Sequence, residues 1–343
     1  MKIGERVIDD KHYPYVVAEI GAGHCGSLDI AMDLVRDAYR AKADAVKLQT
    51  YTPASMTLPS KAEAFQIKGG HWAGNYLWDL YEKAMTPREW HEPLFDEARR
   101  LGITMFSTPF SPDDVDFLEG LGCPAYKVAS CEIAHLELLE AIRETGKPVI
   151  LSTGMASMQD IRAARDALYG RDAALLHCVS GYPTKIAEAN LWGVKSLQST
   201  FPHLQVGLSD HTRGTDAAAL AVALGATIVE KHIGERESLD GEFAMPPMFF
   251  GRVVVAVRDA WDAMQETDPL SEVPSRALRR SIWTATAIRA GERITREDLA
   301  IVRPAGGLDP ADLPLVVGSV ATRDIEPFQP LTQDMFRQDG IDG

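Results

Sequence analysis

The sequence predicts an α/β fold in which eight parallel strands and their helices close into a TIM (β/α)8 barrel, followed by a small second domain. Short apolar runs alternate with amphipathic helical patterns through roughly the first three quarters of the 343-residue chain. Such alternation indicates a parallel sheet. Eight units in about 250 residues are typical of a TIM barrel, and a doubly wound open sheet is the alternative.

The eight expected strands share an apolar, β-branched character and are bounded by turn residues. They are residues 15–21, 43–50, 103–110, 125–130, 149–154, 174–179, 206–211 and 227–233. The segments between them include amphipathic patterns such as SLDIAMDLVRDAYRAK and SMQDIRAARDALYG. Each of these patterns supplies one apolar face, which fits a helix packed on the outside of a barrel.

One connection within the barrel is longer than the others. Residues 51–86 follow the carboxyl end of the second strand, and long connections there usually cover the active-site mouth of a barrel. The alternative is a packed excursion that its aromatic residues only hold in place. These aromatic residues are Trp72, Tyr76, Trp78 and Tyr81.

The alternating pattern ends at a polar segment that contains proline, QETDPLSEVPSRA. We therefore expect a barrel domain over residues 1–266, a linker over 267–277 and a second domain over 278–343. The second domain has short strand-like runs and many Gly and Pro turns.

Composition excludes several classes of partner. The net charge of −14 argues against nonspecific nucleic-acid binding, and no apolar run is long enough to predict a membrane span. The first residues lack the apolar core of a signal peptide, and the four cysteines form no CxxC pair. We therefore expect a cytoplasmic protein with reduced thiols.

Polar residues stand at the end of every expected strand, although barrel strands are normally buried and apolar. Taken singly, a histidine can be structural, a lysine can extend to water and a serine can cap a helix. Eight strands that meet at one mouth would bury these groups together, which is costly without a function. The residues are Glu19, Lys47, Gln49, Ser107, Thr108, Lys127, Ser130, Glu132, Ser152, Thr153, His177, Ser180, Ser209, Asp210, His211, Glu230, Lys231 and His232.

The residue types fit one kind of chemistry. Lys47 and Lys127, with hydroxyl groups from neighbouring strands, predict a pocket for phosphate or carboxylate. His211 and His232 end adjacent strands and are able to reach one divalent cation; in isolation, such a pair suits Zn, Mn, Fe or Co better than Ca or Mg. Two protein ligands leave the cation open to polarise a carbonyl, and Glu19 would move protons.

The chain resembles the sialic acid synthase family over nearly its whole length. The resemblance lies in AEIGAGHCGSLDIA, ADAVKLQTYTP, STPFSPDDVDFLEGLGCPAYKVAS, GKPVILSTGMAS, LLHCVSGYP, VGLSDHTRG and VEKHI, in this order. The tail SIWTATAIRAGERITREDLAIVRPAGGL resembles that family's C-terminal antifreeze-like (SAF) domain. The resemblance implies a barrel followed by a SAF domain, and condensation of phosphoenolpyruvate with an amino sugar.

Within the family, three segments are most similar to pseudaminic acid synthases: KLQTYTPASMT, IKGGHWAGNYLWDLYEKAMTPREWHEPLFDEARRLGIT and RPAGGLDP. This similarity implies that the sugar is 2,4-diacetamido-2,4,6-trideoxy-L-altrose and that the products are pseudaminic acid and phosphate. The alternatives are an N-acetylneuraminate or legionaminate synthase, and, more remotely, a noncatalytic sugar-binding protein.

The resemblance also implies roles for individual residues. His211 and His232 would hold Mn, Mg or Co, Glu19 would be the first choice for proton transfer and Asp240 the second. Arg303 would reach into the mouth of a partner subunit and touch the sugar, which implies a domain-swapped homodimer. The other substrate-binding residues would be Lys47, Gln49, Thr108, Lys127, Ser130, Glu132, Ser152, Ser180, Tyr182 and Ser209.

Two positions depart from the family's pattern. Gly23 stands where members often have asparagine, and Gly241 and Glu242 are unusual neighbours of Asp240. We expect these residues to face the sugar and so to bear on its identity. Arg213, close to His211, is left without a role.

Overall fold

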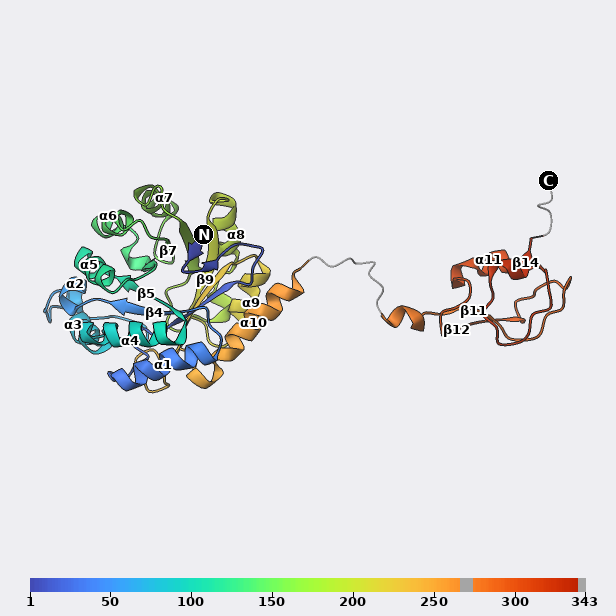
Figure 1. Cartoon of the computed structure of the whole chain (residues 1–343), viewed down its shortest axis with the longest axis horizontal. Coiled ribbons are helices and arrows are strands. Elements are labelled where there is room, and N and C mark those ends of the chain that lie inside the picture. Colours follow the sequence, from blue (N-terminus) through green and yellow to red (C-terminus); the bar gives the residue numbers. More distant parts are fainter. Residues whose placement is uncertain (266–273, 339–343) are drawn as a thin grey trace. The chain divides into compact units, whose positions relative to one another are not determined.

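The computed structural model describes residues 1–265 and 274–338. The chain divides into two compact units, Met1–Gln265 and Glu266–Gly343 (Figure 1). The expected linker over 267–277 lies mostly outside the described residues, and its last part belongs to a 3-10 helix at Pro274–Leu278.

The first unit contains a closed barrel of eight parallel strands, which confirms the predicted TIM barrel and excludes the open sheet. The strands follow one another around the barrel in chain order, and the last one closes it by pairing with the first. They are β3 (Tyr15–Glu19), β4 (Ala45–Thr50), β5 (Thr104–Pro109), β6 (Tyr126–Val128), β7 (Val149–Ser152), β8 (Ala173–Cys178), β9 (Gln205–Asp210) and β10 (Ile228–His232). All eight predicted strands are therefore present. The strand β6 is shorter than predicted because the chain enters a 3-10 helix at Ser130–Glu132.

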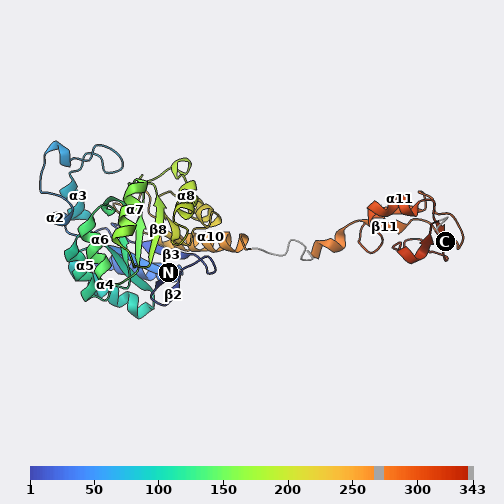
Figure 2. The same ribbon diagram turned by 90° about the horizontal axis from the view of Figure 1, so that it is seen from above.

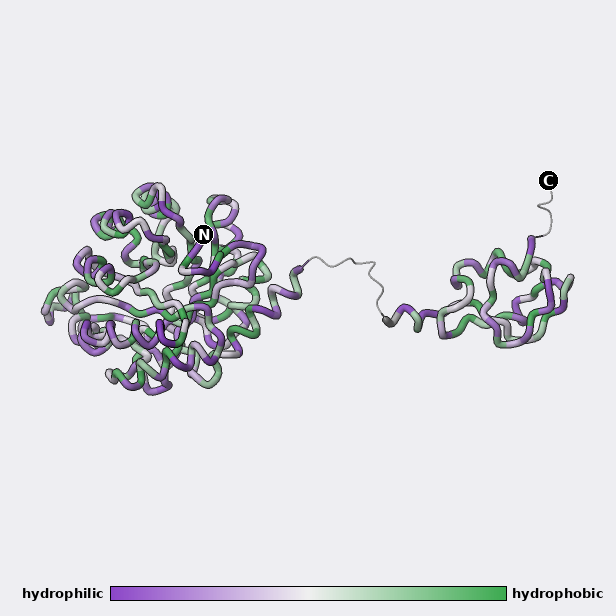
Figure 3. Tube along the Cα trace, viewed as in Figure 1, coloured by the Kyte–Doolittle hydropathy of each residue, from purple (hydrophilic) through white to green (hydrophobic). Residues whose placement is uncertain are grey.

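Helices surround the barrel and bury their apolar faces against it. In α1, for example, Ala31, Leu34, Val35 and Ala38 are buried, and the Ser27 hydroxyl caps the first turn. Figure 3 shows hydrophobic and hydrophilic stretches alternating along these helices. The helices are α1 (Leu28–Arg40), α4 (Arg88–Leu101), α5 (Pro112–Gly120), α6 (Leu136–Glu144), α7 (Met158–Ala167), α8 (Trp192–Thr200), α9 (Asp216–Ala223) and α10 (Phe250–Ala263).

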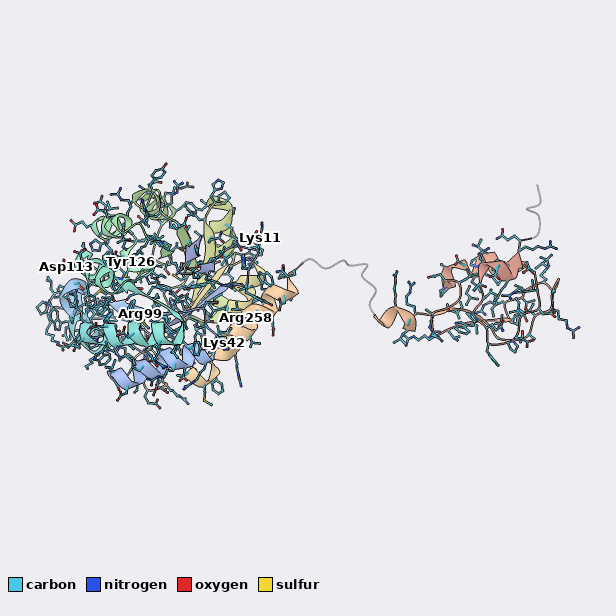
Figure 4. The ribbon with its side chains drawn as sticks, in the orientation of Figure 1. Lys11, Lys42, Arg99, Asp113, Tyr126 and Arg258 are labelled. Atoms are coloured by element: carbon cyan, nitrogen blue, oxygen red, sulfur yellow. The ribbon has the colours of Figure 1, made fainter. Side chains whose placement is uncertain are left out.

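The first and last helices of the ring lie beside each other and help to close it. The guanidinium of Arg258 on α10 donates to the carbonyl oxygen of Lys42, just after α1, at 3.2 Å (Figure 4). A hairpin of β1 (Lys2–Ile3) and β2 (Arg6–Val7) precedes the barrel. Its Ile3 side chain joins the barrel's hydrophobic core.

The long connection after β4 is partly ordered into helices. It contains α2 (Pro53–Met56), a 3-10 helix at Glu63–Phe65 and α3 (Leu77–Ala84). Figure 2 shows it as a blue excursion that projects from the barrel. Its position at the carboxyl end of a strand is the one that places loops at a barrel's active-site mouth.

The second unit is a small, mainly β structure with its own core. The strand β11 (Ser281–Thr284) pairs with β12 (Leu299–Val302), and β13 (Val320–Ala321) pairs with β14 (Phe336–Arg337), both antiparallel. A short helix, α11 (Leu313–Val316), precedes β13, and 3-10 turns lie at Pro310–Asp312 and Gln333–Met335. The core consists of Ile282, Ile288, Ile294, Leu299, Val316, Ala321, Ile325, Leu331, Met335 and Phe336. Within the described residues, no helix has the length and apolar character needed to cross a membrane.

Candidate active site

Alternation along the strands decides which polar residues enter the barrel. On β10, Glu230 contacts residues of the barrel interior, whereas the next residue, Lys231, points the opposite way. Lys231 Nζ lies 2.7 Å from Asp210 Oδ2, and both side chains are completely buried. These two residues form a structural ion pair outside the polar cluster.

The first part of the polar cluster is centred on Lys47. Its Nζ atom lies 2.6 Å from Glu19 Oε2 and donates to the Thr108 hydroxyl at 2.9 Å. The second Glu19 oxygen accepts a hydrogen bond from Gln49 Nε2 at 2.7 Å. Glu19 is therefore held by a cation on one oxygen and an amide on the other.

The second part is centred on Lys127, which is also buried. Its Nζ atom donates to the Ser152 hydroxyl at 2.6 Å and to the carbonyl oxygen of Val128 at 2.9 Å. Burial lowers the pKa of Lys127, and nearby Glu230 opposes this shift. The hydroxyls of Ser130 and Ser180 lie 3.4 Å apart and add further donors from the next loops.

Glu230 joins the two lysine groups, and sequence reasoning did not select it for a role. Its Oε1 atom accepts from the Ser209 hydroxyl at 2.9 Å, and its Oε2 atom lies 3.9 Å from Lys47 Nζ. Burial alone would raise the pKa of this carboxyl group. Lys127, Lys47 and the Ser209 hydrogen bond outweigh burial, so the pKa lies well below its usual range. The sequence did contain one indication of a role for Glu230: it stands two residues before His232, so the two side chains lie on the same face of the strand.

The two histidines lie side by side at the ends of adjacent strands, with ring centroids 5.6 Å apart. His211 Nδ1 donates to the carbonyl oxygen of Val179 at 2.9 Å, and His232 Nδ1 lies 3.0 Å from Asp240 Oδ2. Both bonds use Nδ1, so Nε2 is the nitrogen that each ring has left for a ligand. Burial, followed by the charge of His232, lowers the pKa of His211 to about 4. The ring is therefore neutral near pH 7, as metal ligation requires.

The pair fits a divalent cation with open coordination positions. Hydrogen bonds from the second ring nitrogen to a carbonyl or carboxylate are the usual way that proteins orient histidine ligands. Among residues 1–265 and 274–338, no group of three or more His, Cys, Asp or Glu side chains is arranged to hold a metal. A cation here would therefore have two protein ligands, His211 and His232, and would take its remaining ligands from substrate or water.

The carboxylate of Asp240 lies at the histidine pair. Its Oδ2 atom accepts from the backbone N–H of Ala22 at 3.0 Å as well as contacting His232. The carboxylate thus joins the β3–α1 loop to the ring of His232. This geometry fits a residue that orients His232 better than one that exchanges protons with substrate.

An aromatic cluster packs against the histidine pair. The Tyr182 ring lies 4.4 Å from His211, and the Phe243 ring lies 4.9 Å from His232. Trp72, from the long connection, packs on Tyr182 at 5.4 Å and on Phe243 at 6.0 Å. The connection therefore reaches the mouth through Trp72, as predicted, whereas Tyr81 packs on Tyr51.

Two of the noted barrel residues, Glu132 and His177, bond to partners outside this cluster, and Arg303 belongs to the second unit. Glu132 Oε2 is 3.0 Å from His135 Nδ1, so its carboxylate is paired within its own loop. His177 Nε2 lies 2.9 Å from the carbonyl oxygen of Ala189, among the outer loops and helices. Arg303 is exposed in the second unit, and its side chain makes no hydrogen bond with the described residues.

The two unusual glycines, Gly23 and Gly241, lie where backbone segments approach each other closely. A Cβ atom on Gly23 would lie 2.5 Å from the carbonyl oxygen of Ile233, so the two loops pack too closely for any side chain. A Cβ atom on Gly241 would overlap the carbonyl oxygen of Arg236. Glu242 pairs with the exposed guanidinium of Arg213, which gives Arg213 a partner at the rim.

Comparisons with known proteins agree with this arrangement. The NeuB family model matches residues 34–268, and the SAF domain model matches residues 279–337. Pseudaminic acid synthase of Campylobacter jejuni (strain 81-176) is 39% identical over 346 residues, covering 98% of this chain and all of that protein. N,N'-diacetyllegionaminic acid synthase of Legionella pneumophila is 34% identical over 319 residues, covering 89% of each.

Solved structures give the same result. The N-acetylneuraminic acid synthetase from Leptospira borgpetersenii, crystallised with citrate, has a TM-score of 0.71 and 28% identity to this chain. The match covers 80% of this chain and 93% of that one. The barrel and the second unit thus have counterparts in one group of synthases, and the chain belongs to the NeuB family and carries a SAF domain.

Proposed function

We propose that this chain is a pseudaminic acid synthase, which condenses phosphoenolpyruvate with 2,4-diacetamido-2,4,6-trideoxy-L-altrose and water to give pseudaminic acid and phosphate. Membership of the NeuB family and relatives that are named synthases support an enzyme that makes a nonulosonic acid. The higher identity to a pseudaminic acid synthase than to the legionaminic acid synthase favours the first sugar. The observation that carries the proposal is the pair of buried lysines, Lys47 and Lys127, beside the histidine pair.

The two lysines would bind phosphoenolpyruvate. Hydroxyl groups of Thr108 and Ser152 already lie within hydrogen-bond distance of their ammonium groups and would complete a set of donors. In the free site, the carboxylates of Glu19 and Glu230 offset the two positive charges. A strongly anionic substrate therefore needs an additional positive charge nearby, and the histidine pair is the place in the site suited to hold one.

His211 and His232 would hold a divalent cation, with Mn, Mg and Co as the expected metals. When bound, such a cation supplies Lewis-acid polarisation of the sugar's aldehyde oxygen. The histidine pair, fixed by Val179 and Asp240, would keep its Nε2 atoms directed at that position.

The proposed reaction forms one bond between the substrates. C3 of phosphoenolpyruvate attacks C1 of the open-chain sugar, water adds at C2, and phosphate leaves with cleavage of its C–O bond. Water gives up both of its protons: one ends on the former aldehyde oxygen, and the other leaves with phosphate when the C2 carbonyl forms. We assign the proton transfer to Glu19, because Lys47 and Gln49 hold its two carboxylate oxygens in place beside the lysine pocket.

We also propose that Arg303 serves the site of a partner subunit in a homodimer. Its guanidinium is exposed and has no hydrogen-bond partner among the described residues, so it is available for a ligand. Mixing an Arg303→Ala protein with a Glu19→Gln protein tests this idea. Recovery of activity in the mixture is the expected result, and a mixture no more active than its components would contradict it.

A sugar panel tests the proposed function. Phosphate release from phosphoenolpyruvate should require both a divalent metal and 2,4-diacetamido-2,4,6-trideoxy-L-altrose. Turnover with N-acetylmannosamine or with the legionaminate precursor, and none with the altrose sugar, would move the assignment to the alternative synthases. Sugar binding without any release of phosphate would instead indicate a noncatalytic binding protein.

A further inference from the structure

The aromatic cluster gives the mouth an apolar side that the proposed chemistry does not use. Phe243 is almost completely buried and packs on His232, while Trp72 covers Phe243 and Tyr182 from the side of the long connection. Trp72 is half-buried and fixed, because its indole Nε1 donates to the carbonyl oxygen of Leu239 at 3.2 Å. We call the two rings of Trp72 and Phe243 the aromatic wall.

We propose that the aromatic wall is a specificity-determining surface that receives the methyl end of a 6-deoxy amino sugar and disfavours the same sugar with a 6-hydroxyl group. This inference rests on the proposed function and adds to it the residues that contact one end of the sugar and determine which group is accepted there. Trp72 comes from the long connection and not from the barrel strands, and binding residues are often carried by such loops.

The placement follows from the order of groups across the mouth. The lysines and hydroxyls that suit phosphoenolpyruvate lie on one side, and the histidine pair lies next to them through Glu230 and Ser209. The reacting C1 of the sugar must lie beside phosphoenolpyruvate, so the rest of its carbon chain extends past the histidines. Phe243 packs on His232 and Trp72 packs on Phe243, so the aromatic wall borders the histidine pair.

The chemistry of the wall favours a methyl group over a hydroxymethyl group. Phe243 has no polar side-chain atom, and the only donor of Trp72 is already bonded to Leu239. A 6-hydroxyl group pressed against these rings would lose its hydrogen bonds to water without replacement. Apolar pockets of this kind reject an added hydroxyl by at most about a hundredfold, so we expect a preference of roughly ten- to a hundredfold.

The test compares two sugars that differ in one oxygen: 2,4-diacetamido-2,4,6-trideoxy-L-altrose and its 6-hydroxy counterpart. The quantity measured is the ratio of kcat/KM for the two sugars in the full-length, metal-loaded protein. Trp72→Gln should reduce the preference for the 6-deoxy sugar by about tenfold. Trp72→Phe should retain the preference, because it keeps an apolar ring and loses only the bond to Leu239.

Two further variants make the result decisive. Trp192→Gln, at a tryptophan that is 71% exposed at the start of α8, should leave the ratio unchanged. Tyr182→Phe removes the hydroxyl group of the aromatic cluster, and the preference should persist. An equal loss for both sugars in Trp72→Gln, or a ratio that responds to Tyr182→Phe alone, would overturn the proposal. If the parent protein turned over neither sugar, the proposed function would fail instead.

Discussion

The geometry of Asp240 makes a prediction that separates orientation of His232 from acid–base catalysis. The Asp240 carboxylate is buried, and its Oδ2 atom contacts both His232 Nδ1 and the Ala22 N–H at 3.0 Å. A partner of this kind on a metal-binding histidine typically changes metal affinity by 10–100-fold. Asparagine keeps an acceptor oxygen but loses the charge, and charge-assisted hydrogen bonds are roughly twice as strong as neutral ones. We therefore expect Asp240→Asn to weaken Mn²⁺ binding about tenfold and Asp240→Ala about a hundredfold.

The assay is calorimetric titration of Mn²⁺ into metal-stripped protein, with free Mn²⁺ followed in parallel by electron paramagnetic resonance. Glu242→Gln is the matched control, because this carboxylate lies two residues later in the same loop and pairs only with exposed Arg213 among the described residues. Its Kd should equal that of the parent. Unchanged Mn²⁺ affinity in both Asp240 variants, together with a large loss of turnover, would refute the orienting role and favour proton transfer by Asp240.

Three further predictions concern charge and stability. Lys127→Met should lower kcat/KM for phosphoenolpyruvate by about 10²–10³-fold, measured by phosphate release, because a buried cationic donor is lost; a change below threefold would exclude substrate binding by Lys127. Asp210→Asn should lower the free energy of unfolding by about 3–5 kcal/mol in denaturant titrations, since it leaves Lys231 buried without its counter-charge, and an unaltered KM for phosphoenolpyruvate should accompany this loss. Burial lowers the pKa of His91 to about 4, below the usual 6.5 of an unfolded chain. Between these two pH values the folded state binds fewer protons than the unfolded state. The free energy of unfolding therefore decreases as the pH falls from about 6.5 to 4. The free energy of unfolding should fall less steeply with decreasing pH in His91→Gln than in the parent protein. Identical slopes in the two proteins would contradict the low pKa of His91.

Much of the fold was predictable because the barrel strands are continuous apolar runs bounded by turns. Strand ends that converge at one mouth also made the association of Lys47, Lys127 and the histidine pair predictable. Alternation along a strand explains why His211 and the adjacent Asp210 have different partners. These features depend on local sequence patterns and on one general property of the barrel.

The remaining features depend on contacts between distant segments, which local patterns do not encode. The packing of Trp72 on Phe243 joins the long connection to the loop after β10. The same is true of Gly23, whose lack of a side chain reflects the close approach of a loop more than two hundred residues away. The pairing of Glu132, which the resemblance assigned to the substrate, with His135 is another contact that the strand pattern does not encode.

The central claim is that the lysine pocket condenses phosphoenolpyruvate with an amino sugar through C–O cleavage. The most direct measurement uses phosphoenolpyruvate with ¹⁸O in the bridging C2–O–P position, together with the trideoxy altrose sugar and Mn²⁺, and analyses both products by mass spectrometry. The account predicts unlabelled pseudaminic acid and phosphate that carries the label, in equal amounts. Labelled phosphate formed without the sugar, or a sugar product that retains the ¹⁸O, would contradict it.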